Sequence, residues 1–177
     1  MIGTLAGMPN YRRDWTPGGT WCFTVNLLER RRNDLLVRRF DLLRRCVAVE
    51  RGRRPFSVVA WVVLPDHMHW IWSLPEGDAD YATRWRWIKT DFSLGLEKSE
   101  HLSVTRQRRS ERGIWQRRYW EHRVRDDGDL ARCIDYIHFN PVKHAHVVNV
   151  ADWPHSSFHR FVRMGAYPKD WAGASIT

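Results

Sequence analysis

The fold is decided by the stretch Phe56-Ser-Val-Val-Ala-Trp-Val-Val-Leu-Pro-Asp-His-Met-His-Trp-Ile-Trp-Ser-Leu74, near the middle of the 177-residue chain. Residues 56–64 are almost all valine and aromatic, which predicts a strand that is covered on both of its faces. Pro65 and Asp66 predict a turn, and residues 67–74 predict a second strand. The stretch is therefore expected to form a β-hairpin.

The segments on either side predict further strands and a helix. Residues 20–26 are β-branched and aromatic enough to form a strand, and residues 114–124 predict another. A helix is expected after Asn33 and Asp34, which can cap it. Its apolar side chains recur every three or four residues along one stripe, at Leu36, Phe40, Leu43 and Val47.

Two more helices complete the predicted order of elements. One is expected at residues 81–98 and the other from about 126 to 139, where Pro141 would end it. The order β-α-β-β-α-β-α is most simply built as an α+β fold of ferredoxin-like type, with one antiparallel sheet and helices on one face. Because no repeat or interdomain linker interrupts the chain, a single domain is expected.

The chain is strongly basic, with 29 lysine and arginine residues against 20 acidic residues and a net charge of +9. Nucleic acid is the leading explanation, because an arginine fork grips phosphate and stacks on bases. The alternative is an arginine-rich composition inherited from a GC-rich genome, with the charge simply solvated. The eleven tryptophans tilt the balance slightly toward nucleic acid, since aromatic side chains beside cations stack on unpaired bases.

The rest of the composition excludes several classes of protein. A content of 43% hydrophobic residues supports a buried core and excludes wholesale disorder. The longest apolar run, residues 58–64, is too short to span a bilayer, and residues 1–9 lack a signal-peptide pattern. Three scattered cysteines without a CxxC motif argue against a disulfide framework or a zinc ribbon, and they favour a reducing cytoplasm.

His67 and His69 are candidate metal ligands in the second strand of the hairpin. Residues two apart in a strand point to the same face, with Cα atoms about 6.6 Å apart. Two imidazoles at this spacing can bind one divalent metal ion. The alternative is a pair of polar residues beside a hairpin turn. Because the flanks are apolar, burying two unpaired imidazoles would be costly without a ligand or a hydrogen-bond partner, which favours a metal or catalytic site.

Tyr136 and Asn140 form a second candidate pair, near the end of the last predicted helix. Residues four apart lie one above the other on a helix, so a phenol and a carboxamide can face one site. A tyrosine hydroxyl is a poor nucleophile near neutral pH, but it can attack a phosphodiester if a metal polarises the phosphoryl oxygen. The alternative is structural, with Tyr136 at the edge of the core and Asn140 as a helix cap before Pro141.

With these residues in hand, the sequence resembles the REP-associated tyrosine transposases, a family related to the single-tyrosine HUH transposases of insertion sequences. The resemblance covers nearly the whole chain, and the ordered set of motifs is highly specific. Ala145 departs from the pattern, because a glycine is expected there. The matching segments are Met8-Pro-Asn-Tyr-Arg-Arg13, Gly18-Gly-Thr-Trp-Cys-Phe-Thr-Val-Asn26, Leu64-Pro-Asp-His-Met-His-Trp-Ile-Trp72, Gly113-Ile-Trp-Gln-Arg-Arg-Tyr-Trp-Glu-His122, Asp135-Tyr-Ile-His-Phe-Asn-Pro-Val-Lys-His144, Asp152-Trp-Pro-His-Ser-Ser-Phe158 and Asp170-Trp-Ala-Gly173.

The resemblance implies a ferredoxin-like HUH domain at residues 8–150, with a C-terminal extension, residues 151–177, that packs on this domain or contacts DNA. It implies that His67 and His69 bind Mg²⁺ or Mn²⁺ with Asn140 near the metal, and that Tyr136 is the nucleophile. The implied substrate is single-stranded DNA with repetitive extragenic palindrome (REP) hairpins. Cleavage would leave a 5′-phosphotyrosine and a free 3′-OH, which permits strand transfer.

The expected DNA contacts, cellular location and oligomeric state follow from the same resemblance and from the positive charge of the chain. The protein is expected to act in the bacterial cytoplasm, associated with the nucleoid, as a monomer or homodimer with no membrane partner. The cations expected to contact DNA are Arg12, Arg13, Arg106, Arg108, Arg109, Arg117 and Arg118.

Two other functions remain open from the sequence. The chain could be a hairpin DNA- or RNA-binding protein that has lost catalysis, although His67, His69 and Tyr136 are all present. It could also be a metal phosphohydrolase that uses the two histidines without Tyr136. The second alternative predicts released product and no covalent adduct between protein and DNA.

Overall fold

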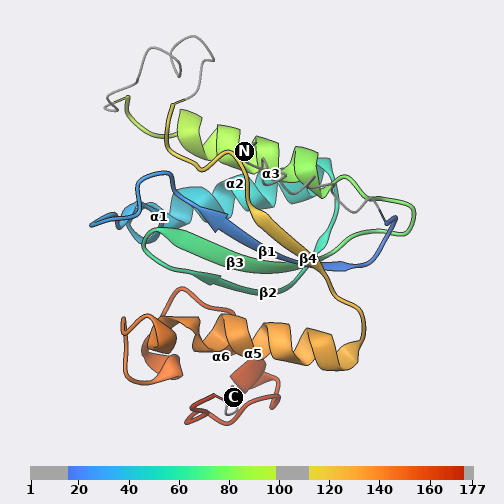
Figure 1. The fold of residues 1–177 in the computed structure, drawn as a ribbon, viewed down its shortest axis with the longest axis vertical. Coiled ribbons are helices and arrows are strands. Elements are labelled where there is room, and N and C mark those ends of the chain that lie inside the picture. The colour runs from blue at the N-terminus through green and yellow to red at the C-terminus, as the bar shows by residue number, and fades with distance from the viewer. Residues whose placement is uncertain (1–15, 99–111, 174–177) are drawn as a thin grey trace, which may run out of the picture.

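The computed structural model describes residues 16–98 and 112–173, which form an α+β fold around one antiparallel sheet (Figure 1). The order of strands across the sheet is β2-β3-β1-β4, so β3 and β1 are central and β2 and β4 form the edges. The expected hairpin is confirmed, because β2 and β3 pair antiparallel. The strands are β1 (Thr20–Asn26), β2 (Ser57–Val63), β3 (His67–Ser73) and β4 (Trp120–Arg123).

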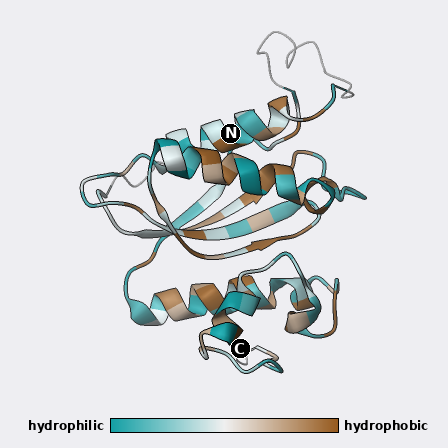
Figure 2. Ribbon diagram, turned by 180° about the vertical axis from the view of Figure 1, so that it is seen from behind, coloured by the Kyte–Doolittle hydropathy of each residue, from teal (hydrophilic) through white to brown (hydrophobic). Residues whose placement is uncertain are grey.

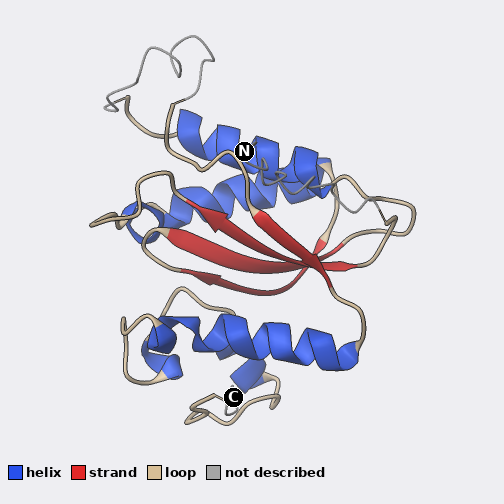
Figure 3. Cartoon of the chain, viewed as in Figure 1, coloured by secondary structure: helices blue, strands red, loops and turns tan. Residues whose placement is uncertain are grey.

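Helices lie on both faces of this sheet, as Figures 1 and 3 show. The α+β class and the antiparallel sheet are confirmed, but the expectation that the helices occupy one face is wrong. None of the helices in the described ranges is both long and apolar enough for a membrane span. One layer contains α1 (Leu35–Arg38), α2 (Phe40–Arg53) and α3 (Tyr81–Leu94), and the other contains α5 (Asp127–Lys143), the 3-10 helix η1 (Val150–Asp152) and α6 (Phe158–Arg163).

Two apolar cores explain why both faces need a helical layer (Figure 2). Successive residues of a strand point to opposite sides, and in β1 and β3 both sides are buried. Phe23 and Trp72 pack in the core under α2 and α3, where Trp72 stacks on Trp85 at 4.1 Å between ring centroids. Cys22 and Ile71 face the other way and pack with Ile137 of α5. Because neither set can be left in water, a helix covers each face.

The last strand is shorter than expected. Of residues 114–124, only β4 pairs continuously with β1, while Trp115 makes an isolated bridge to Leu27. The Trp115 ring packs instead against Phe92 of α3, at 5.3 Å between ring centroids. This contact holds the start of the segment on the α3 side and leaves a short edge strand.

Helix α5 continues through Pro141, contrary to the expectation that it ends near residue 139. A proline inside a helix removes one backbone hydrogen bond. Pro141 is buried, and the Asn140 side chain donates to the Tyr136 carbonyl oxygen at 3.3 Å, one turn earlier. Burial of the ring and this added hydrogen bond offset part of the cost, and the helix gains a further turn.

The end of α5 is a tight Schellman turn at Ala145, where a glycine was expected. The His146 N–H donates to the Pro141 carbonyl, and the Ala145 N–H donates to the Val142 carbonyl, both at 2.9 Å. Ala145 consequently has a φ of 55°, in the left-handed region. A side chain at this φ is strained, whereas glycine adopts it freely.

Replacing Ala145 by glycine should therefore stabilise the protein by about 1 kcal/mol, because relief of the left-handed strain exceeds the added entropy of the unfolded chain. Urea unfolding monitored by circular dichroism measures the change. Ala131→Gly, at an exposed position in the first half of the same helix, is the matched control and should cost about 1 kcal/mol. A loss of stability in Ala145→Gly would contradict this account of the turn.

Candidate functional site

His67 and His69 lie on the face of β3 that α5 covers, and each is fixed through its Nδ1 atom. His67 Nδ1 lies 2.6 Å from Asp66 Oδ1, and His69 Nδ1 lies 2.9 Å from Thr24 Oγ1 on β1. Because an ionised carboxylate only accepts hydrogen bonds, His67 donates from Nδ1 to Asp66. Asp66 is in turn held by Arg30, whose Nε donates at 2.6 Å. This arrangement leaves the Nε2 atoms for another partner.

Burial keeps these histidines neutral. It lowers the pKa of His69 to about 3, and the nearby His67 and His144 act in the same direction. Burial also lowers the pKa of His67, although the carboxylate of Asp66 opposes the shift. Burial would raise the pKa of Asp66, but the hydrogen bonds from His67 and Arg30 bring it below its usual value. A neutral imidazole held by a carboxylate is the form that binds a metal ion.

Helix α5 carries Tyr136 to the same place. The Tyr136 ring lies 5.4 Å from the His69 ring, nearly perpendicular to it, and the side chain is 37% exposed. Lys143 Nζ lies 4.6 Å from the centre of the Tyr136 ring. The tyrosine is thus accessible from solvent, next to the histidines and beside a cation.

Two buried polar atoms at this place have no hydrogen-bond partner, His69 Nε2 and Asn140 Oδ1. Asn140 lies close enough to His69 for its side chain to favour the charged imidazole. An unpaired buried nitrogen and carbonyl oxygen each cost free energy unless a cation or a donor satisfies them. Both atoms are ligands for divalent cations, so the residues present fit a metal ion.

The structure adds residues that the sequence reasoning missed or ranked low. His144 lies beside His67, at 5.0 Å between ring centroids, because α5 continues through Pro141 and His144 is its C-cap. Spacing alone gave His144 little weight. Thr24 and Asp66 were missed as positioning residues. Pairing of Thr24 with His69 is a matter of strand register, which the sequence does not show.

The predicted DNA-contacting arginines divide into two groups. Arg117 and Arg118 are exposed in the segment that leads into β4. The others, Arg12, Arg13, Arg106, Arg108 and Arg109, lie outside the described residues.

A second group of metal-ligand atoms lies between β4 and α5. The ligand atoms of His122, Asp129 and Cys133 are all within 4.8 Å of one another, so this group could also hold a metal ion. Asp129, however, already accepts from His122 at 2.8 Å and from Arg125 Nε at 3.0 Å. These contacts lower the pKa of Asp129 well below its usual value, Arg125 contributing most, and they satisfy the carboxylate without a metal.

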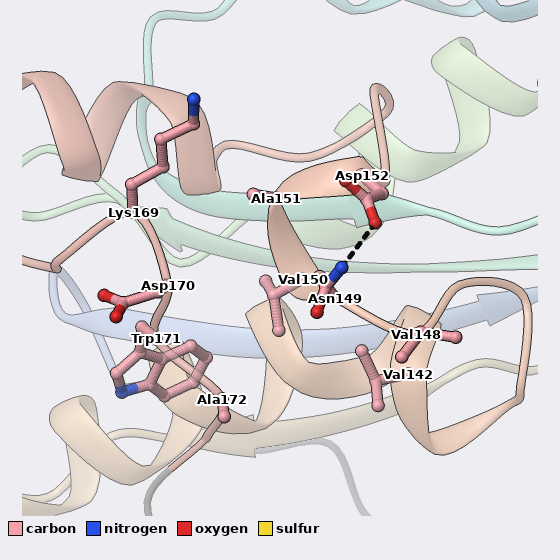
Figure 4. Close-up of a pocket in the computed structure, with 10 residues that line it drawn as sticks. All are labelled: Val142, Val148, Asn149, Val150, Ala151, Asp152, Lys169, Asp170, Trp171 and Ala172. Atoms are coloured by element: carbon pink, nitrogen blue, oxygen red, sulfur yellow. Dashed lines mark hydrogen bonds between the residues drawn. The ribbon is translucent and has the colours of Figure 1, made fainter.

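A surface hollow lies apart from these groups, between the end of α5 and the C-terminal segment (Figure 4). It is lined by Val142, Val150 and Trp171 among others, and the Asn149 side chain donates to Asp152 across one wall at 2.9 Å. None of its lining residues is a candidate metal ligand or the candidate nucleophile.

Known proteins resemble this chain along nearly its whole length, although no protein-family model matches it. It is 48% identical over 168 residues to the REP-associated tyrosine transposase of Escherichia coli K12, covering 94% of this chain and 92% of that protein. It is 47% identical over 167 residues to a Haemophilus influenzae protein that is provisionally given the same name, covering 94% of each. A solved REP-associated tyrosine transposase bound to a REP hairpin superimposes with a TM-score of 0.82 at 46% identity, over 96% of this chain and 94% of that chain. The chain therefore belongs to the REP-associated tyrosine transposases.

Proposed function

We propose that the protein is a metal-dependent single-stranded DNA endonuclease and strand transferase that acts at REP-type hairpins through a 5′-phosphotyrosine. One observation carries the proposal. The exposed Tyr136 lies against His69, whose Nε2 is buried and unpaired beside the equally unpaired Asn140 Oδ1. A nucleophile beside buried, unpaired atoms that can bind a cation suits metal-assisted attack on a phosphodiester.

His67, His69 and Asn140 would hold Mg²⁺ or Mn²⁺, which when bound supplies electrophilic activation of the scissile phosphate. The Tyr136 oxygen attacks phosphorus and loses its proton, the bond to the 3′ oxygen breaks, and that oxygen leaves as a 3′-OH. One phosphodiester is exchanged for another, so a 3′-OH from a second strand can reverse the attack and join the strands. Lys143, beside the Tyr136 ring, offers a positive charge to the phosphate.

The DNA is proposed to be a single strand that carries a REP hairpin, since a relative 46% identical in sequence is solved bound to one. Arg117 and Arg118 would contact phosphates, together with the basic arm and the arginine-rich segment outside the described residues. The protein would act in the bacterial cytoplasm at the nucleoid, as a monomer or homodimer.

Residues 8–150 would form the HUH nuclease domain and residues 151–177 the C-terminal extension. Ser157 Oγ accepts a hydrogen bond from the Trp61 N–H of β2 at 2.9 Å and also contacts His138 of α5 at 2.9 Å. These contacts tie the extension to the sheet and to α5, which supports the packing role proposed for it.

Replacing Tyr136 by phenylalanine should abolish a covalent adduct with labelled single-stranded hairpin DNA in Mn²⁺, because phenylalanine has no nucleophilic oxygen. Denaturing gel electrophoresis detects the adduct. Tyr167→Phe is the control, since it removes a hydroxyl that hydrogen-bonds Asp135 on the same helix and leaves Tyr136 intact. An adduct that persists in Tyr136→Phe would exclude Tyr136 as the nucleophile.

Replacing His69 by alanine should lower the cleavage rate at least about 100-fold and change the dissociation constant for hairpin DNA less than about threefold, because the side chain binds the cation rather than most of the DNA. Fluorescence anisotropy and single-turnover cleavage measure the two effects separately. Equal losses of binding and cleavage would mean that His69 has a structural role. A wild-type protein that binds DNA tightly and forms no adduct would favour a binding protein without catalysis.

A further inference from the structure

Trp120 is an exposed aromatic residue on the same sheet face as the candidate metal ligands. The register pairs Trp120 of β4 with Thr24 of β1, and Thr24 with His69 of β3. Directly paired residues point to one face, so these three side chains form a row across the sheet. At the usual strand spacing, the Cα atoms of Trp120 and His69 are about 10 Å apart.

This face is open at the Trp120 end of β4, whereas the His122 end contacts Asp129 of α5. Helix α5 packs on β2 and β3, and Trp120 at the other edge of the sheet remains 56% exposed. A large apolar ring in water is unfavourable, and the hydrophobic effect favours covering it. Its position, in line with His69, whose ring contacts Tyr136, places it where a strand that crosses the site would run.

The Trp120 ring has an aromatic neighbour on its own face of the strand. His122 lies beside it, nearly parallel, with an interplanar angle of 13° and 5.8 Å between ring centroids. His122 is fixed by Asp129 at 2.8 Å, and Asp129 by Arg125 and Arg132. The group of His122, Asp129 and the two arginines therefore supports an aromatic platform, which is a role for it that needs no metal.

The charge around this platform suits a polyanion. Arg117, Arg118 and Arg125 are exposed just before and just after β4, against the exposed carboxylates of Asp126 and Asp127. Cations beside an exposed aromatic ring are typical of surfaces that bind single-stranded nucleic acid. A second protein chain that added a strand at β4 is a poorer fit, because a four-residue edge strand flanked by arginines opposes such pairing.

We propose that Trp120 stacks on a base of the single strand, within a few nucleotides of the bond that Tyr136 attacks. This inference rests on the proposed function and assigns a base-stacking residue to the same site. The stack would orient the strand along the row formed by Trp120, Thr24 and His69, and so direct the scissile phosphate to Tyr136.

A double-mutant cycle between Trp120 and individual bases tests the proposal. The probe is the REP hairpin DNA of the solved relative, with single-stranded flanks on both sides and one abasic site placed at each flank position in turn. Fluorescence anisotropy gives the dissociation constants of wild-type protein and of Trp120→Ala. Trp120→Phe, which keeps a smaller stacking ring, guards against misfolding, and Trp87→Ala is the control for an exposed tryptophan on α3.

Trp120→Ala should raise the dissociation constant for intact DNA about 10-fold or more, and Trp120→Phe should retain most of the affinity. At one or two flank positions near the cleaved bond, an abasic site should weaken wild-type binding and leave Trp120→Ala unaffected. Trp87→Ala should bind as wild type. The adduct assay on the same preparations distinguishes failure of the stacking proposal from failure of the proposed function. Coupling between Trp120 and a base without a covalent adduct would overturn the proposed chemistry and leave the stacking proposal supported.

Three results would overturn the proposal. The first is an equal loss of affinity from the Trp120→Ala substitution at every abasic position, because such a result shows no coupling between Trp120 and a particular base. The second is wild-type affinity in Trp120→Ala, or no binding of the probe by wild-type protein. The third is a change of oligomeric state in Trp120→Ala, measured by light scattering, with no coupling to DNA, because it would assign the exposed ring to a protein interface.

Discussion

The period of two along β3 is the constraint on which the rest of the structure depends. Met68 and Trp72 point into the core under α2 and α3, while His67 and His69 point toward α5. A slip of one residue would bury the imidazoles among tryptophans and turn Met68 and Trp72 toward α5. The apolar core under α2 and α3 therefore fixes the register, and the register fixes where the histidines point. One strand register therefore determines both the packing of the core on one face of β3 and the geometry of the candidate site on the other.

Helix α5 is the second rigid element, because it carries both Tyr136 and Asn140. Asp126 caps its start by accepting from the Asp129 N–H at 2.7 Å, and the Schellman turn closes its end. Between these caps, Ile137 packs on the sheet and holds the helix against β2 and β3. The proposed nucleophile is thus placed by a capped and packed helix, as expected where reacting groups must be held within a fraction of an ångström.

Local patterns predicted the parts of the site that lie within one element, and long-range contacts supplied the rest. The pairs His67 and His69, and Tyr136 and Asn140, follow from strand and helix periods. The valine-rich run at residues 56–64 predicted a strand covered on both faces. The expectation that all helices lie on one face of the sheet was inconsistent with this pattern. Asp66 and Thr24 depend on side-chain orientation and strand register, and His144 depends on the continuation of α5 through Pro141, which the sequence argues against. A proline inside α5 was tolerated because tertiary packing outweighs local preference.

The central claim is that the two histidines present their Nε2 atoms to one divalent cation beside Tyr136. Electron–nuclear double resonance of Mn²⁺ bound to the wild-type protein tests it most directly, because imidazole ligands give nitrogen hyperfine couplings. The account predicts couplings from two imidazole nitrogens, reduced to one in His67→Ala and in His69→Ala alike. Mn²⁺ bound without nitrogen coupling, or with couplings that persist when both histidines are replaced, would contradict it.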